Sequence, residues 1–196
     1  MNLSIVIPVR RPELGKSRLA PALDEADRAA LVKRMFCHVL LVATRSVLAD
    51  RCHVVSQSPL LLNLAAAAGA HAVRETGSGL NAALEQAAAL VDREAPVLAL
   101  SADLPLLASE DIAALAGELR NADVVVATDR AGTGTNALLL RETGMIPYAF
   151  GEASLARHKA AAAGKGLRFA VIRRPRLAAD VDHPADLDLL LTSQNP

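Results

Sequence analysis

The stretch that decides the fold is VLALSADLPLL, residues 97–107. It opens with a short apolar run, which is typical of a strand covered on both faces of a sheet. Asp103 follows where the run ends, and Pro105 then prevents the strand from continuing. Ligands of open α/β sheets bind outside the carboxyl ends of the strands, so Asp103 is a candidate for holding a metal ion or a ligand. The alternative, which this segment alone favours, is a turn residue that caps the next helix.

Strand-like and helix-like patterns alternate along the rest of the chain. Apolar runs predict strands at residues 3–9, 52–56, 70–73, 97–100, 124–128, 137–140 and 168–172. Helical spacing predicts helices at residues 24–43, 60–68 and 109–119, with Asp24 or Asp27 as the cap of the first and Ser109 as the cap of the third. Three more helices are predicted: one that ends at about Val91, one that follows Ser154 and one that follows Pro184. This alternation predicts one domain over residues 1–196, with a mainly parallel sheet and helices on both faces.

Composition narrows the classes of partner. Basic and acidic residues number 21 each, so the formal charge is zero, which argues against duplex nucleic acid. Aromatic residues make up 2% of the chain, which leaves few stacking platforms for single strands. Cys37 and Cys52 match no metal or redox spacing and are expected to be free thiols. Without a signal-peptide pattern or a long apolar run, we expect a cytoplasmic protein with no membrane partner.

Two loops carry polar or basic groups directly after predicted strands. Residues 10–19 hold four basic side chains where phosphates are commonly bound, although the spacing is not that of a Walker loop. A solvated basic loop is the equally weighted alternative, and the role of Arg10 and Arg11 stays open. Residues 128–136 are dense in hydroxyls, glycines and backbone donors, which favours a cage for phosphate or carboxylate oxygens.

Three further segments are less decisive. The glycines of residues 77–79 precede a helix and could let a ligand approach the backbone, but a flexible cap is as plausible. Ser154 can cap the helix that follows, and His158 fits a surface or capping histidine better than a catalyst. The basic turn at residues 173–176 is expected to be solvated. Asp182 precedes Pro184 and is either an N-cap or a second carboxylate for a metal shared with Asp103.

Several of these motifs occur together in the order of one known family. They are Ile7-Pro8-Val9, Gly15-Lys16-Ser17-Arg18-Leu19, Asp103-Leu104-Pro105-Leu106, Gly132-Thr133-Gly134-Thr135-Asn136, Phe150-Gly151 with Ser154 and His158, and Asp180-Val181-Asp182 with Pro184, Asp186 and Leu187. Nearly the whole chain thereby resembles the 2-phospho-L-lactate guanylyltransferase family of deazaflavin coenzyme F420 biosynthesis. The Asp-Leu-Pro and terminal Asp motifs are shared more widely among Rossmann-like nucleotidyltransferases.

The resemblance implies transfer of GMP from GTP to 2-phospholactate, phosphoenolpyruvate or 3-phosphoglycerate, with release of pyrophosphate. It implies a nucleotide-diphospho-sugar transferase type of fold, and Mg²⁺ held by Asp103 and Asp182, with Lys16 as a third catalytic residue. By similarity the nucleotide would be bound by Pro8, Lys16, Arg18, Gly79, Leu80 and Asn81. The acid would be bound by Thr133, Thr135, Asn136, Gly151 and Ser154.

The expected chemistry needs no activated side chain, because a phosphate monoester is mostly dianionic at neutral pH and brings its own nucleophile. The repulsion between two polyanions must instead be offset by metal charge, basic side chains and backbone donors. Two alternatives stay open: a nucleotidyltransferase acting on a molybdopterin, and a GTP-binding regulator without turnover. The sequence leaves the choice of acid and the oligomeric state open, and a homodimer is compatible with it.

Overall fold

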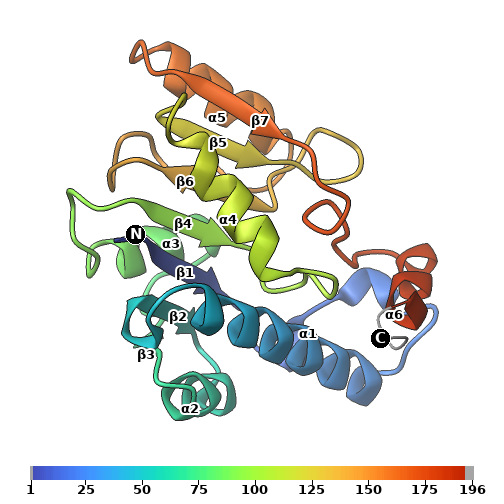
Figure 1. Cartoon of the computed structure of the whole chain (residues 1–196). Coiled ribbons are helices and arrows are strands. Elements are labelled where there is room, and N and C mark those ends of the chain that lie inside the picture. Colours follow the sequence, from blue (N-terminus) through green and yellow to red (C-terminus); the bar gives the residue numbers. More distant parts are fainter. Residues whose placement is uncertain (1, 193–196) are drawn as a thin grey trace.

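The computed structural model describes residues 2–192 and arranges them around one seven-stranded sheet (Figure 1). The strands are β1 (Ser4–Pro8), β2 (Cys52–Ser56), β3 (His71–Arg74), β4 (Val97–Leu100), β5 (Val124–Ala127), β6 (Ala137–Leu140) and β7 (Phe169–Ile172). The α-helices are α1 (Glu25–Ser46), α2 (Pro59–Ala67), α3 (Leu80–Ala88), α4 (Ser109–Glu118), α5 (Ser154–Ala163) and α6 (Asp188–Thr192). Short 3₁₀ helices cover Pro12–Leu14, Ser17–Leu19, Ala49–Arg51 and Pro184–Leu187.

The sheet is mainly parallel, as the sequence predicts, with one reversed strand. The strand order is β3-β2-β1-β4-β6-β5-β7, and β6 runs antiparallel to both β4 and β5. The segment at residues 128–136 that joins β5 to β6 contains no helix. A parallel crossover needs a longer connection, so the chain turns back as a wide hairpin and β6 enters the sheet in the opposite direction.

Alternating strand residues feed two hydrophobic layers, one on each face of the sheet. Ile5, Ile7 and Leu98 pack with α1, α2 and α4 on one face, whereas Val6 and Ala99 pack with α3 and α5 on the other. In Figure 1, α1 and α4 lie in front of the sheet. Among residues 2–192, no helix has both the length and the apolar character needed to cross a membrane.

A third apolar cluster fixes the loops at the carboxyl edge of the sheet. Leu19 of the Ser17–Leu19 turn and Val181 of the last loop are fully buried together with Met35 of α1. Burial of these side chains stabilises the contact between segments more than 160 residues apart in the chain, roughly 1.5–3 kcal/mol for each large apolar side chain. The basic loop after β1 and the terminal Asp motif are thereby held side by side.

Candidate active site

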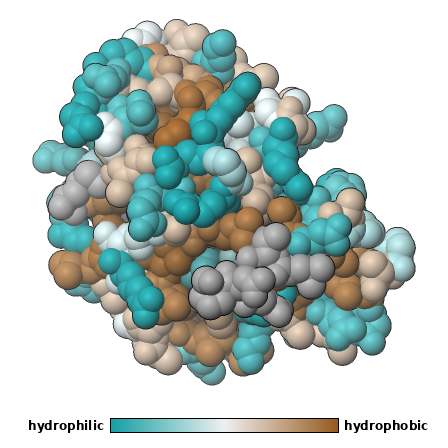
Figure 2. Space-filling view, turned by 45° about the vertical axis from the view of Figure 1, so that its right-hand side comes forward, coloured by the Kyte–Doolittle hydropathy of each residue, from teal (hydrophilic) through white to brown (hydrophobic). Residues whose placement is uncertain are grey.

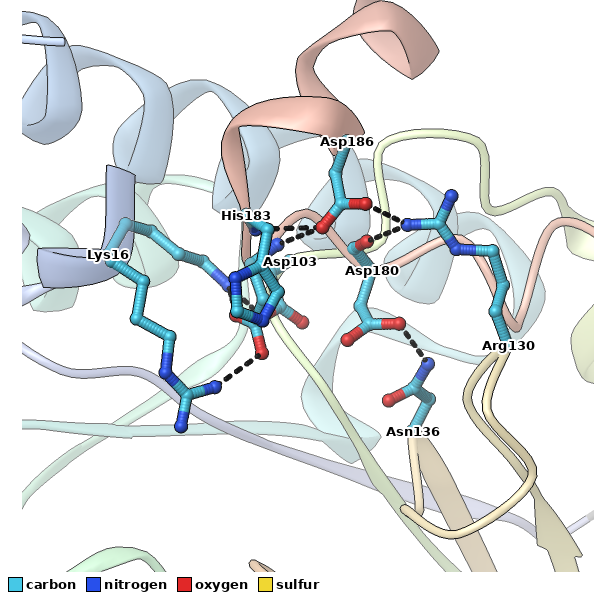
Figure 3. Close-up of polar contacts among 9 residues, drawn as sticks. Lys16, Asp103, Arg130, Asn136, Asp180, His183 and Asp186 are labelled. Carbon is cyan, nitrogen blue, oxygen red and sulfur yellow. Dashed lines mark hydrogen bonds and ion pairs between the residues drawn. The ribbon is translucent and has the colours of Figure 1, made fainter. Parts of the chain in front are cut away.

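Three charged side chains from distant segments meet at the carboxyl edge of the sheet, and we call Lys16, Asp103 and Asp182 the charged cluster. Figure 3 labels Lys16 and Asp103 of this cluster. The Lys16 ammonium donates to a carboxylate oxygen of Asp103 and to Oδ1 of Asp182, at 2.7 Å for the latter. Arg18 Nη1 lies 3.8 Å from Oδ2 of Asp182. The Lys16 side chain is 10% exposed, so its charge is held in a partly desolvated site.

Electrostatics keep this cluster charged. Burial opposes the charge on Lys16, but Asp103 and Asp182 outweigh it, so the pKa of Lys16 is raised above its ordinary value. The pKa of the neighbouring Asp180 carboxyl is also raised, by burial first and then by repulsion from Asp103 and Asp182, and for a carboxyl this shift favours the neutral form. The cluster is therefore a place where negative charge accumulates and a cation is stabilised.

The backbone of Lys16 is in an unusual conformation. Its φ of 54° and ψ of 40° lie in the left-handed region, which costs a non-glycine residue on the order of 1 kcal/mol or more. Lys16 is the N-cap of the Ser17–Leu19 turn, and in this conformation its side chain points toward the two aspartates. The ion pairs and the burial of Leu19 hold this geometry.

The capping interpretation of Asp182 is wrong, because Asp186 makes the capping contacts. Oδ2 of Asp186 accepts from the backbone N–H groups of Asp182 and His183 at 2.9 and 2.8 Å. Arg130 of the 128–136 loop also donates to Asp186 (Figure 3). The Asp182 carboxylate is thereby left to face Lys16.

Asp103 does not cap the following helix either. Ser109, the expected cap of α4, is its first residue, and the Asp111 carboxylate accepts from the Ala108 N–H at 3.1 Å in its place. Asp111 itself is buried and accepts from Arg174 and Arg176 at 2.6 and 2.7 Å, so the prediction of a solvated basic turn at residues 173–176 fits the exposed Arg173 but not these two partly buried arginines. Burial opposes ionisation of Asp111, but these donors hold its pKa below the ordinary value.

A cavity of about 560 Å³ opens beside the charged cluster. That volume lies within the usual range for small-molecule sites. Its lining includes seven of the residues predicted to touch nucleotide or metal: Pro8, Lys16, Arg18, Gly79, Leu80 and both aspartates of the charged cluster. Leu14 and Leu80 expose apolar surface at its rim. Figure 2, which turns this side of the molecule forward, shows hydrophilic side chains bordering hydrophobic ones.

Asn81 does not line this cavity, although it was predicted to contact the nucleotide. Its side-chain amide donates to the carbonyl of Phe150 at 3.2 Å and its Oδ1 accepts from the Phe150 N–H at 2.8 Å. The side chain thus fastens the segment before Gly151 to the start of α3. Direct nucleotide contact by Asn81 stays a prediction.

The 128–136 loop is folded around its own carboxylate. Asp129 Oδ1 accepts from the N–H groups of Thr133 and Gly134 at 2.9 and 3.0 Å, so two of the expected anion-binding donors are already occupied. A side chain at Gly134 would lie 2.6 Å from Asp129 Oδ2, which explains the glycine. The carbonyl of Thr133 accepts from the Leu155 N–H at 3.1 Å and joins the loop to α5.

Asn136 is also held by internal contacts. Its side-chain amide donates to the Leu177 carbonyl and to Asp180 Oδ1, both at 3.0 Å, and Figure 3 shows the second of these bonds. The backbone carbonyl of Asn136 accepts from the backbone N–H of Ser101 at 2.9 Å, which places Thr135 and Asn136 beside the segment that ends in Asp103. Contact of Asn136 and Thr133 with the acid stays a prediction.

A second group of polar side chains is buried where α5 meets this loop, and we call Thr135, Ser154 and His158 the hydroxyl cluster. They are 7%, 1% and 0% exposed. His158 Nδ1 lies 3.1 Å from Thr135 Oγ1, and Nε2 accepts from the Ala149 N–H at 3.0 Å. The expectation of a surface or capping histidine is therefore wrong.

Ser154 is the first residue of α5 and not its cap. The cap position is Ala153, with a φ of 50°, and it follows Gly151, whose φ of 112° favours glycine. Among residues 2–192 the Ser154 hydroxyl oxygen has no hydrogen-bond partner, although it is buried. A buried polar group without a partner costs free energy, so this hydroxyl is available to a ligand.

The arrangement of layers and loops is the fold of the nucleotide-diphospho-sugar transferases. A crystal structure of such a putative transferase from Desulfovibrio desulfuricans superposes with a TM-score of 0.76 over 99% of this chain and 88% of that one, at 18% identity. An identity this low shows the fold alone.

The family is shown by sequence. Residues 3–195 match the family described as "Guanylyl transferase CofC like", and the chain belongs to this family. A protein of Rubrobacter xylanophilus named phosphoenolpyruvate guanylyltransferase is 42% identical over 98% of this chain and 95% of its own length. A protein of Phenylobacterium zucineum named 3-phospho-D-glycerate guanylyltransferase is 37% identical over 92% of this chain and 86% of its own.

Proposed function

We propose that this protein transfers GMP from GTP to a phosphorylated three-carbon acid and releases pyrophosphate, as a step of deazaflavin coenzyme F420 biosynthesis. The observation that carries the proposal is the meeting of Lys16, Asp103 and Asp182 beside a cavity, in a chain that belongs to the guanylyl transferase family. Relatives named for phosphoenolpyruvate and for 3-phosphoglycerate support both acids as candidates.

The donor set of the charged cluster fits Mg²⁺. Among residues 2–192, no three His, Cys, Asp or Glu side chains form a complete metal cage. Mg²⁺ commonly takes one or two carboxylates together with phosphate oxygens and water, and Asp103 and Asp182 already share one cation, the Lys16 ammonium. Bound there, Mg²⁺ would supply charge that stabilises the triphosphate and the departing pyrophosphate.

Lys16 has a second role in this proposal. Its ammonium neutralises the aspartates in the structure, and it would turn toward the phosphates when nucleotide and metal bring their own charges. The exposed Arg18 stands at the cavity and would add positive charge toward the same phosphates. Lysine and arginine placed around a transferred phosphoryl group commonly lower its barrier by electrostatic stabilisation.

The acid would be held on the other side of the charged cluster by Thr135, Gly151 and Ser154. One of its phosphate oxygens would attack the α-phosphorus of GTP, forming a new phosphoanhydride bond while the bond to pyrophosphate breaks. No side chain has to become covalently linked, because the acid's phosphate is ionised at neutral pH. Orientation of the two substrates is the main task left to the protein.

A substrate panel tests this function. The protein is incubated with Mg²⁺, each of ATP, CTP, GTP and UTP, and each of the three acids, and pyrophosphate release is measured. We expect release with GTP and at least one of the acids. Asp103→Asn should abolish it, whereas Asp50→Asn, at an exposed aspartate before β2 on the opposite edge of the sheet, should not.

Two outcomes would replace the proposal. Tight GTP binding without pyrophosphate release, with every acid, would indicate a regulator. Release that requires CTP, or a pterin acceptor in place of the acids, would indicate a molybdopterin-type nucleotidyltransferase.

A further inference from the structure

His158 is a buried histidine that the proposed reaction does not use. It lies on α5, four residues after Ser154, and residues at this spacing share one face of a helix. Both side chains are almost fully buried, and His158 contacts Thr135 directly. The inference below rests on the proposed function, because it concerns how the acid is held.

The contacts of the imidazole decide which nitrogen carries its proton. Nε2 faces the backbone N–H of Ala149 at 3.0 Å, and a backbone N–H can only donate. Nε2 must therefore be the accepting, unprotonated nitrogen. A neutral imidazole carries its one proton on the other nitrogen, so Nδ1 donates to Thr135 Oγ1 at 3.1 Å.

Neutrality of this ring agrees with its surroundings. Burial first, and the charge of Arg157 second, lower the pKa of His158 to about 4. In a protonated ring, Nε2 would carry a proton that points at the backbone N–H of Ala149, so two donors would face each other. At neutral pH the ring therefore stays in one tautomer with one orientation.

The tautomer determines what the Thr135 hydroxyl can do. Its oxygen accepts from His158, so its own proton points elsewhere, and within residues 2–192 it has no other hydrogen-bond partner. Ser154 Oγ on the same helix face is buried and unpartnered as well. Two hydroxyl groups are thus connected to His158, Thr135 by its hydrogen bond and Ser154 by its place one helical turn earlier, and the Asn136 carbonyl next to Thr135 accepts from the Ser101 N–H in the segment that leads to Asp103.

We propose that His158 is a positioning residue of the acid site: its Nδ1–H fixes the Thr135 hydroxyl as a donor to an anionic oxygen of the acid. The ring itself does not touch the acid and adds no charge. Its bond to the Ala149 N–H also orients the segment that runs to Gly151. A histidine serves here because it accepts on one side and donates on the other.

Two substitutions separate these contacts. In His158→Asn, the amide nitrogen takes the place of Nδ1, so donation to Thr135 is kept and the Ala149 contact is lost. In His158→Gln, the amide oxygen takes the place of Nε2, so the Ala149 contact is kept and donation to Thr135 is lost. We expect His158→Gln to raise the KM for the acid about tenfold, the usual effect of one hydrogen bond to a charged group, with the KM for GTP unchanged. His158→Asn should stay near the parent.

A double-mutant cycle with Thr135→Val tests whether His158 acts through Thr135. Once the hydroxyl is absent, His158→Gln should raise the KM for the acid no further, so the double variant should match Thr135→Val. If the double variant instead showed the product of the two separate increases in the KM for the acid, the proposal would be overturned. A parallel rise in both KM values, or a loss of melting temperature in His158→Gln that fully accounts for its lost activity, would also overturn it.

An activity-independent readout keeps this inference separate from the proposed function. The ¹⁵N chemical shifts of an imidazole distinguish a protonated from an unprotonated ring nitrogen, and the His158 signals are assigned by their absence in His158→Asn. We expect a protonated Nδ1 and an unprotonated Nε2 at neutral pH. The reverse tautomer would overturn the inference even in an active enzyme, whereas the expected tautomer in an inactive protein would leave only the proposed function refuted.

Discussion

The charged cluster and the hydroxyl cluster are connected through the backbone bond between Ser101 and Asn136 but are built on opposite principles. Lys16, Asp103 and Asp182 carry full charges, stay partly open to solvent and neutralise one another. Thr135, Ser154 and His158 are uncharged at neutral pH, almost fully buried, and leave hydroxyl groups without an acceptor in the part of the chain that the structure describes. The difference matches two tasks, which are the electrostatic stabilisation of a polyphosphate and the recognition of a small acid by its shape.

The comparison also shows how each cluster keeps its geometry. The charged cluster is held by ion pairs and by the apolar contact of Leu19 with Val181. The hydroxyl cluster is held by α5 and by the Thr133–Leu155 backbone bond. Arg130 connects the two, because it belongs to the loop of Thr135 and binds Asp186, whose carboxylate accepts from the Asp182 N–H.

The largest effect is expected at Asp103. Asp103→Asn removes a charge from the proposed metal site and should lower kcat about 10³-fold, a typical cost for a group that stabilises transition-state charge. Lys16 keeps its pair with Asp182, so the fold should survive. The check is pyrophosphate release at saturating substrates together with circular dichroism. A folded variant with the parent kcat would refute the metal assignment.

A smaller and more selective effect is expected at Ser154. Ser154→Ala removes a buried hydroxyl that has no partner among residues 2–192, so the free energy of unfolding should rise by up to about 1 kcal/mol while the KM for the acid increases about tenfold. Denaturant unfolding and initial rates measure the two. Ser109→Ala is the matched control, because Ser109 begins α4 as Ser154 begins α5 but is exposed, and it should change neither quantity. Destabilisation by Ser154→Ala would instead indicate a capping role.

The smallest effect concerns pH. Burial lowers the pKa of both His158 and His53 from 6.5 to about 4, with Arg157 and His71 as further causes. Between these values the unfolded chain binds more protons than the folded one, so the unfolding free energy should fall as pH drops from 6.5 toward 4. In His158→Asn this slope should be smaller, because only His53 remains. Denaturant unfolding across this interval measures it, and an unchanged slope would contradict a neutral buried His158.

The charged cluster could be predicted from the sequence more readily than the hydroxyl cluster. Asp103 and the basic loop each follow a buried apolar run, and parallel strands bring such positions to one edge of the sheet. The choice between cap and ligand for Asp182 was not decided locally, because Asp186, four residues later, supplies the competing carboxylate.

The hydroxyl cluster depends on contacts that no local pattern encodes. His158 is buried because α5 packs against the 128–136 loop, which is distant in sequence. The one available signal is the spacing of Ser154 and His158, which places them on the same helix face. The reversal of β6 had a clearer signal, since the connection before Ala137 is too short for a parallel crossover.

One measurement tests the division of labour between the clusters most directly. Pyrophosphate release is followed at crossed concentrations of GTP and phosphoenolpyruvate (or whichever acid the panel identifies) for the parent, Asp103→Asn and Ser154→Ala. We predict that Ser154→Ala regains the parent kcat at saturating acid, whereas Asp103→Asn stays slow at every concentration of both substrates. Recovery of Asp103→Asn at high GTP, or a Ser154→Ala variant that stays slow at saturating acid, would contradict the account.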